Sequence, residues 1–337
     1  MSWSNLEQVV SAIRAFVPAL APTKHKGQAG KVAVLGGCRE YTGAPFFAAI
    51  SALKIGADLS HVFCAKGAGT VIKSYSPELI VHPVLEESYE HESASAQERE
   101  QVAEKAFSAI REWLPRFDCL VVGPGLGRDD LLLRTVAKVI REARSAELPL
   151  VLDGDGLWLA TQEPALIQGY RLAILTPNPN EHRRLVDKVF GPDYKHQQTD
   201  TGQQLRDLAA RLGHVTVVQK GPADQVSDGD TVQAFGEFGS PRRVGGQGDI
   251  MAGSIAIFMA WARQFVQQTE QGTDAFQFFS RTFSSNPGIA AGIAGSLITR
   301  YAAREAFGKH KRSTTTTEII AELGSSVEAL FPAGPST

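Results

Sequence analysis

A glycine-rich turn that runs into a helical pattern has the residue types of an anion-binding site. Gly245, Gly246 and Gly248 stand within four positions, and apolar residues at helical spacing follow from Ile250. Glycine lets the backbone approach a ligand closely, and the unpaired N–H groups at the start of a helix attract negative charge. Asp249 lies at this helix start, so its carboxylate would face the group that carries the anion.

Two interpretations of Asp249 remain open from these residues alone. Asp is a good N-cap after a glycine turn, and a cap would explain its position. The alternative is a side chain that faces a bound ligand. Capping requires neither the neighbouring glycines nor the adjacent cations Arg242 and Arg243, so the wider pattern favours the ligand site.

The same stretch resembles a known family. Its ending Gly-Gly-Gln-Gly-Asp resembles the Gly-Ala-Gly-Asp signature of the ribokinase-like superfamily, and the longer string is similar to the eukaryotic ATP-dependent (S)-NAD(P)H-hydrate dehydratases. The resemblance implies that Asp249 is the catalytic base, with Gly246 and Gly248 beside it. The ATP contacts that it implies here are Gly239, Ser240, Pro241, Arg242, Arg243, Val244, Gly245, Gly246, Gln247 and Gly248.

Short apolar runs recur along the chain in the form of parallel strands buried on both faces. Helical patterns lie between most of them, which predicts one mostly parallel sheet with helices on both faces. The resemblance implies the ribokinase-like α/β fold, a three-layer α/β/α sandwich. We expect a single domain over 1–337, with its core at about 26–303 and a closing helix at 319–330. The predicted strands are Lys31 to Gly37, Ser60 to Ala65, Leu79 to Val84, Cys119 to Gly123, Leu150 to Asp153, Leu172 to Thr176 and Val215 to Lys220.

Two glycine loops follow predicted strands, at 37–45 and at 123–128. In such sheets ligands bind beyond the carboxyl ends of the strands, although tight turns would also explain both loops. The resemblance adds that both loops border the nicotinamide substrate, and it leaves open which glycine of the later loop offers a backbone N–H. The implied substrate contacts are Tyr41, Gly43, Ala44, Gly125 and Gly127.

Asp153 is the last residue of a predicted strand, and Asp155 follows two residues later. Carboxylates this close hold Mg²⁺ through water, orient a hydroxyl or cap a helix, and these options stay open. If one of them caps the predicted helix 157–161, we expect it to be Asp155.

A proline-rich loop at 176–184 offers amides, a carboxylate and cations. A Pro-Asn turn with a capping Glu181 and a solvated His182 explains much of it. The resemblance instead places the string against the substrate, with the basic residues near its phosphates and Glu181 near Mg²⁺ through water. The implied contacts are Asn178, Pro179, Asn180, Glu181, His182, Arg183 and Arg184.

The run Lys220-Gly221-Pro222-Ala223-Asp224 ends the last predicted parallel strand and opens a hairpin that reaches Phe235. A lysine before a glycine turn at a sheet edge is commonly a solubilising residue. The resemblance implies that all five residues border ATP.

Composition limits the classes of partner. The 34 Lys and Arg residues nearly balance the 36 Asp and Glu residues, which gives no electrostatic case for nucleic acid or an acidic membrane surface. The cysteines Cys38, Cys64 and Cys119 show no metal-binding spacing, and we expect buried thiols in a reducing compartment. These features predict a soluble, cytosolic protein; a homo-oligomer remains open.

The resemblance implies ATP-dependent dehydration of the S epimer of hydrated NADH or NADPH, with ATP as phosphoryl donor and Mg²⁺ as cofactor. One rival is a small-molecule kinase of the same fold, such as a vitamin or sugar kinase, which would use Asp249 in the same way. Another is a non-catalytic dinucleotide-binding module, which leaves Asp249 and Lys220 without a role.

Overall fold

The computed structural model describes residues 3–23, 25–191 and 200–332, and its centre is a nine-stranded sheet in the order β3-β2-β1-β4-β5-β6-β7-β8-β9. Neighbours from β3 to β7 are parallel, while β8 and β9 are antiparallel and form the predicted hairpin. Every predicted strand is present, to within one or two residues at each end. The strands are β1 Lys31–Leu35, β2 Leu59–Ala65, β3 Ile80–Leu85, β4 Cys119–Val122, β5 Leu150–Leu152, β6 Ala173–Leu175, β7 Thr216–Gln219, β8 Asp224–Ser227 and β9 Val232–Phe235.

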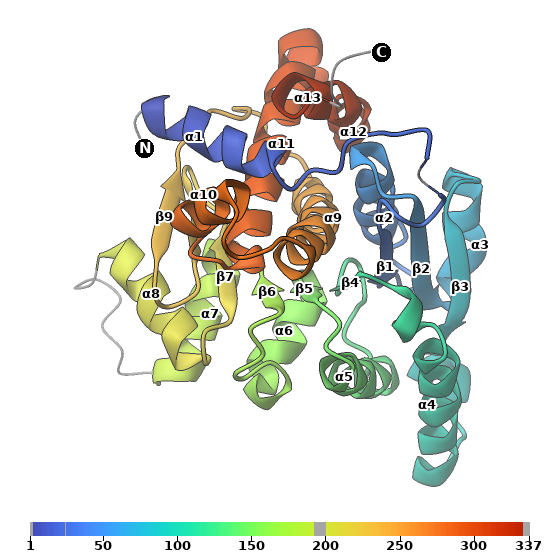
Figure 1. The fold of residues 1–337 in the computed structure, drawn as a ribbon. Coiled ribbons are helices and arrows are strands. Elements are labelled where there is room, and N and C mark those ends of the chain that lie inside the picture. The colour runs from blue at the N-terminus through green and yellow to red at the C-terminus, as the bar shows by residue number, and fades with distance from the viewer. Residues whose placement is uncertain (1–2, 24, 192–199, 333–337) are drawn as a thin grey trace.

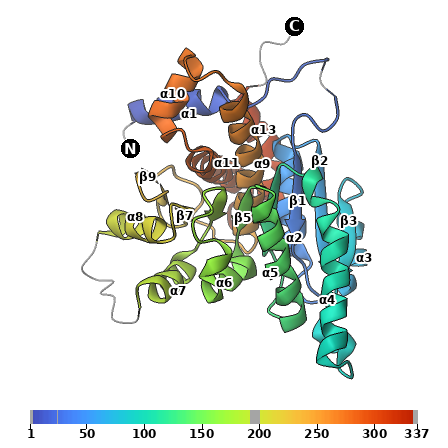
Figure 2. The same cartoon turned by 60° about the horizontal axis from the view of Figure 1, so that its bottom comes forward.

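Helices cover both faces of this sheet, which makes the expected three-layer sandwich (Figure 1). The helices on one side are α1 Trp3–Arg14, α2 Gly43–Ile55, α9 Gln247–Gln268, α10 Asp274–Phe283, α11 Pro287–His310, α12 Thr316–Ala321 and α13 Leu323–Leu330. Those on the other side are α4 Ala96–Arg111, α5 Asp130–Ser145, α6 Gly154–Gln162, α7 Pro179–Phe190 and α8 Thr201–Arg211. Helix α3 Lys66–Tyr75 packs at the β3 end of the sheet (Figure 2).

The period-two alternation of the strands builds two hydrophobic cores. In β1, Val32 and Val34 join the core under α2, α9 and α11, whereas Ala33 and Leu35 join the core under α4 and α5. Fully burying an aliphatic side chain of this size contributes roughly 1.5–3 kcal/mol, so both faces of the sheet hold the strands in register. The ends of these strands are therefore fixed points from which loops can position side chains.

Two helix predictions need correction. The closing helix expected at 319–330 is two short helices, α12 and α13, because a break follows Ala321. The helix after the first glycine loop begins at Gly43, three residues before the predicted start, so the loop is shorter than expected.

The three cysteines are buried and unbridged, as predicted. Burial raises the pKa of the Cys38 thiol to about 11 and that of Cys64 to about 12, which makes both poor nucleophiles. Within the described residues, no helix is long and apolar enough to cross a membrane.

Candidate active site

The glycine turn before α9 is built as an anion-binding helix start. Gly246 occupies the N-cap position with φ +93°, a conformation that favours glycine, and a Cβ there would lie 2.7 Å from the ring of Phe47. Asp249 lies inside the first turn of α9 and makes no capping hydrogen bond. The N-cap interpretation of Asp249 is therefore wrong, because the helix begins two residues before it.

Strands β5, β6 and β7 bring polar groups to the same place. Lys220, after β7, donates from Nζ to Oδ1 of Asp153 at 2.7 Å, and Thr176 donates from Oγ1 to the same oxygen at 2.7 Å. The side chains of Lys220 and Asp153 are only 20% and 7% exposed. A Cβ at Gly248 would lie 3.2 Å from Nζ of Lys220, so this ion pair adjoins the glycine turn. Lys220 is not a solubilising edge residue, because β8 and β9 continue the sheet beyond β7.

Three carboxylates surround the Lys220 ammonium group. Burial, and next the negative charge of Asp153, raises the pKa of Asp249 to about 7, although Lys220 opposes the shift. Burial also raises the pKa of Glu181. Burial alone would lower the pKa of Lys220, but Asp153, Glu181 and Asp249 together raise it. A carboxylate with a pKa near neutrality is suited to general base catalysis.

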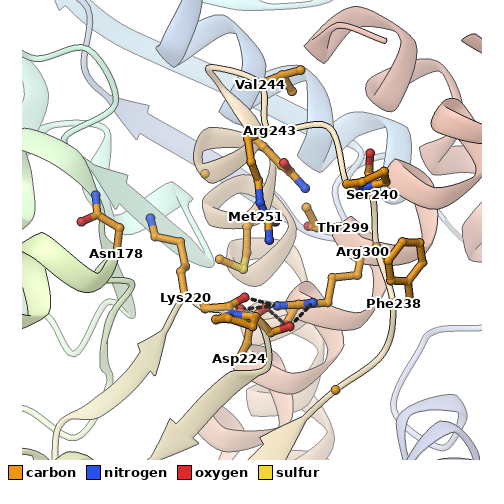
Figure 3. A pocket seen from close by; sticks show the side chains of 18 of the residues that line it. Asn178, Lys220, Asp224, Phe238, Ser240, Arg243, Val244, Met251, Thr299 and Arg300 are labelled. Carbon is orange, nitrogen blue, oxygen red and sulfur yellow. Dashed lines mark hydrogen bonds and ion pairs between the residues drawn. The ribbon is translucent and has the colours of Figure 1, made fainter. Parts of the chain in front are cut away.

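A cavity of about 690 Å³ opens on one side of the glycine turn (Figure 3). Most of the residues predicted to contact ATP line it, and so do residues of α11 that the sequence analysis did not select. The predicted ATP contacts on its wall are Lys220, Gly221, Pro222, Asp224, Gly239, Ser240, Pro241, Arg243, Val244, Gln247 and Gly248. Ala223, Arg242, Gly245 and Gly246, also predicted, are not among its lining residues. Asn178 and Pro179, predicted to contact the substrate, line this cavity instead.

Arg300 on α11 is an important residue that the sequence analysis missed. Its guanidinium donates from Nε to Oδ2 and from Nη2 to Oδ1 of Asp224, both at 2.7 Å, as the dashed lines of Figure 3 mark. It also donates to the carbonyls of Gly221, Pro222 and Glu237 at 2.7–3.1 Å. Asp224 and Arg300 therefore hold together the two segments that form this wall of the cavity.

We expect Arg300→Met to raise the KM for ATP much more than the KM for the other substrate. Removing one partner of a buried ion pair costs roughly 3–5 kcal/mol, so the free energy of unfolding should also fall. The matched control is Arg304→Met on the same helix, which breaks the partly exposed ion pairs with Glu237 and Glu305. Steady-state kinetics and urea unfolding of both variants test this role; an equal rise of both KM values would contradict it.

A second cavity, of about 670 Å³, opens on the other side of the turn. Gly246 and Asp249 lie on its wall, so Asp249 faces this space while Gln247 and Gly248 line the first cavity. Its lining includes every residue of the two early glycine loops that was predicted to contact the substrate, which are Tyr41, Gly43, Ala44, Gly125 and Gly127. Residues predicted for two different ligands thus line cavities on the two sides of one turn.

The later glycine loop is organised by Asp155. Its Oδ2 accepts the N–H of Gly127 at 2.9 Å, and its Oδ1 accepts from Nε of Arg128 at 3.1 Å. Asp155 is therefore not a helix cap, since α6 already begins at Gly154. Because the N–H of Gly127 is engaged, Gly125 is the better candidate for a backbone contact with substrate.

The loop before α7 combines a structural turn with a cavity wall. Asn178 caps α7 through its side chain, and Glu181 accepts the N–H of Asn178 at 2.8 Å, which confirms the predicted capping interaction. His182 is buried, so the solvated alternative for it is wrong. Arg183 and Arg184 are exposed. The lining residues of the two cavities include none of Asn180, Glu181, His182, Arg183 and Arg184.

Comparison with known proteins connects this geometry to a family. The sequence profile described as NAD(P)H-hydrate dehydratase matches residues 32–324. The chain belongs to the NAD(P)H-hydrate dehydratase family. The matched range contains the glycine turn, both cavities and the Lys220–Asp153 ion pair.

Relatives within the NAD(P)H-hydrate dehydratase family are similar over nearly the whole chain. The ATP-dependent (S)-NAD(P)H-hydrate dehydratase of Physcomitrium patens is 52% identical, with 95% of each chain covered. The human protein of the same name is 47% identical, covering 98% of this chain and 86% of its own.

Among solved structures, the fold resembles that of a ribokinase-like superfamily protein from Enterococcus faecalis, with a TM-score of 0.70 and 20% identity. The match covers 96% of this chain and 95% of the other. The fold also resembles that of the ADP/ATP-dependent NAD(P)H-hydrate dehydratase of Bacillus subtilis co-crystallized with ATP/Mg²⁺, with a TM-score of 0.64, 17% identity and 95% and 97% coverage. These likenesses show the ribokinase-like fold, as predicted.

Proposed function

We propose that this protein catalyses the ATP-dependent dehydration of the S epimer of hydrated NADH or NADPH, which yields NADH or NADPH, ADP and phosphate. The observation that carries the proposal is the position of Asp249 on the wall of the second cavity, next to the glycine turn residues that line the first. A phosphoryl group of ATP bound at the glycine turn would lie next to a hydroxyl group held in the second cavity. The names of the plant and human relatives support this activity.

The reaction begins as a phosphoryl transfer. Asp249 accepts the proton of the ring hydroxyl, whose oxygen attacks the γ-phosphorus while the bond to the β-phosphate oxygen breaks and ADP leaves. Such transfers depend on positioning and on stabilisation of negative charge, which the helix start of α9 and Lys220 supply. The ring nitrogen then donates its electron pair as the carbon–oxygen bond breaks and phosphate departs. Loss of a proton from the neighbouring carbon restores the dihydronicotinamide.

The residues around Lys220 fit a magnesium ion held mainly by ATP. Mg²⁺ prefers oxygen ligands and is commonly bound by one or two carboxylates together with substrate phosphates. Glu181 uses Oε2 for the capping interaction, and no described residue donates a hydrogen bond to its Oε1. Glu181 would hold the ion through water, and the ion would neutralise charge on the phosphates. Among the described residues, groups of three potential metal ligands occur elsewhere, at Cys38, Glu40 and Glu87 and at Glu86, Glu90 and His91.

Recovery of dihydronicotinamide absorbance tests the proposal. We expect the dihydronicotinamide absorbance of NADH, which hydrated NADH lacks, to return only when ATP and Mg²⁺ are both supplied. Phosphorus NMR of the completed reaction should show ADP and inorganic phosphate in equal amounts. A stable phosphate ester without inorganic phosphate would instead identify a small-molecule kinase, and an absence of any ATP turnover would favour a non-catalytic binding module.

A further inference from the structure

The second cavity has a marked imbalance of charge. Three carboxylates line it, those of Glu40, Asp155 and Asp249. Arg128 is the sole cationic side chain among the described residues of its wall. A hydrated dinucleotide carries a negatively charged pyrophosphate, which such a wall would repel. A ligand of this class therefore needs the cation, or backbone N–H groups, to bind here.

Arg128 is held in place from two sides while its end stays accessible. Its Nε donates to Asp155 at 3.1 Å, and its guanidinium carbon lies 4.9 Å from the ring centroid of Trp158 on α6. The terminal nitrogens make no hydrogen bond to any described residue, and the side chain is 53% exposed. Stacking on an aromatic ring fixes the guanidinium plane, which reduces the conformational entropy that binding would cost.

We propose that Arg128 binds a phosphate group of the hydrated dinucleotide, either the pyrophosphate or the 2′-phosphate of the NADPH form. This inference rests on the proposed function and adds a substrate-binding residue to it. Two terminal nitrogens in one plane match the oxygens of a phosphate in a bidentate arrangement. In the proposed function ATP binds on the other side of the glycine turn, where Lys220 and Arg243 line the first cavity. Arg128 thus contributes to the affinity for one substrate only.

The test compares Arg128→Met with Arg134→Met. Methionine keeps the apolar contact with Trp158 and removes the charge. Arg134 lies on α5 with a similarly exposed side chain, 51%, and its ion pair with Glu100 is outside the cavity. We expect Arg128→Met to raise the KM for the hydrated dinucleotide roughly 10- to 100-fold, the loss typical of a charge-assisted hydrogen bond, with the KM for ATP unchanged. Arg134→Met should change neither KM.

A comparison of hydrated NADH with hydrated NADPH as substrates distinguishes the two phosphate groups that Arg128 could bind. A contact with the pyrophosphate raises both KM values equally, whereas a contact with the 2′-phosphate raises only that for hydrated NADPH. Unchanged KM values for both substrates, or an equal rise in the KM for ATP, would overturn the proposal.

A binding measurement tests the role of Arg128 independently of the proposed catalytic activity. Titration of wild-type and Arg128→Met protein with NADPH, followed by its fluorescence, does not require turnover. Wild-type protein that binds NADPH more tightly than the variant but restores no dihydronicotinamide would contradict the proposed activity alone. Active wild-type protein with equal NADPH affinity in the variant would contradict only the role of Arg128.

Discussion

Asp249→Asn should lower kcat by about 10²–10⁴, the usual loss when a general base is removed. Asparagine has nearly the same size and cannot accept the proton of the ring hydroxyl. The KM for ATP should change little, because Asp249 faces the second cavity rather than the first. Asp130→Asn is the matched control, since Asp130 is an exposed carboxylate in the first turn of α5. Near-normal turnover of Asp249→Asn would remove Asp249 from the chemistry.

The same variant has a predictable effect on stability. The folded-state pKa of Asp249, about 7, lies above the ordinary value of 3.8, so the folded protein disfavours the charged form. The fold therefore loses stability as pH rises from about 3.8 to about 7, and the neutral asparagine avoids this loss. Thermal unfolding should show Asp249→Asn more stable than wild type at pH 8 and equally stable near pH 4. A lower melting temperature at pH 8 would indicate a structural role instead.

The pH dependence of wild-type activity follows from the same carboxyl group. Asp249 must be ionised to accept a proton, so kcat/KM should fall as pH decreases through about 7. Burial and the charge of Asp153 both raise this pKa. Asp153→Asn removes the second cause and should move the acidic limb of the profile to lower pH. An unshifted limb would mean that another group controls it.

Patterns repeated along the chain made the parallel sheet predictable, together with the edge of the sheet at which the candidate site residues gather. Continuous burial along strands such as β1 and β4 requires both faces of the sheet to be covered, and polar residues at strand ends indicate the edge where ligands bind. The order β3-β2-β1-β4 and the pairing of Lys220 with Asp153 depend on contacts between distant segments, which no local pattern encodes. The sequence analysis selected both residues but did not predict that they form an ion pair.

Other errors arose where one residue type serves two purposes. Asp155 resembled a cap but instead accepts hydrogen bonds from the preceding loop. Arg300 did leave a signal, because it is the first charged residue in the long apolar helix α11. A cation in the apolar part of such a helix needs a buried partner.

Lys220→Met is the second variant for which we expect a large effect. It should lower both the catalytic rate and the stability of the fold. Lys220 lies among three carboxylates, at the place where the proposed function puts the phosphates of ATP. Removing one electrostatic contact to a transferred phosphoryl group commonly costs about 10²–10³ in rate. Lys220 also lowers the pKa of Asp249, so the acidic limb of the pH profile should move above 7. In the Lys220→Met variant, Asp153 stays buried without its ion-pair partner. This should reduce the free energy of unfolding by roughly 3–5 kcal/mol.

The double variant Asp153→Asn/Lys220→Met separates these effects. It removes both charges of the buried pair, so the melting temperature should return most of the way to that of the wild type, because a neutral pair no longer leaves an uncompensated charge. The rate should stay low, since the phosphates still lack the ammonium group. Lys54→Met, on the exposed face of α2, controls for the loss of a surface lysine. Restoration of the rate together with stability would show that Lys220 acts only by compensating Asp153 and makes no contact with the phosphates.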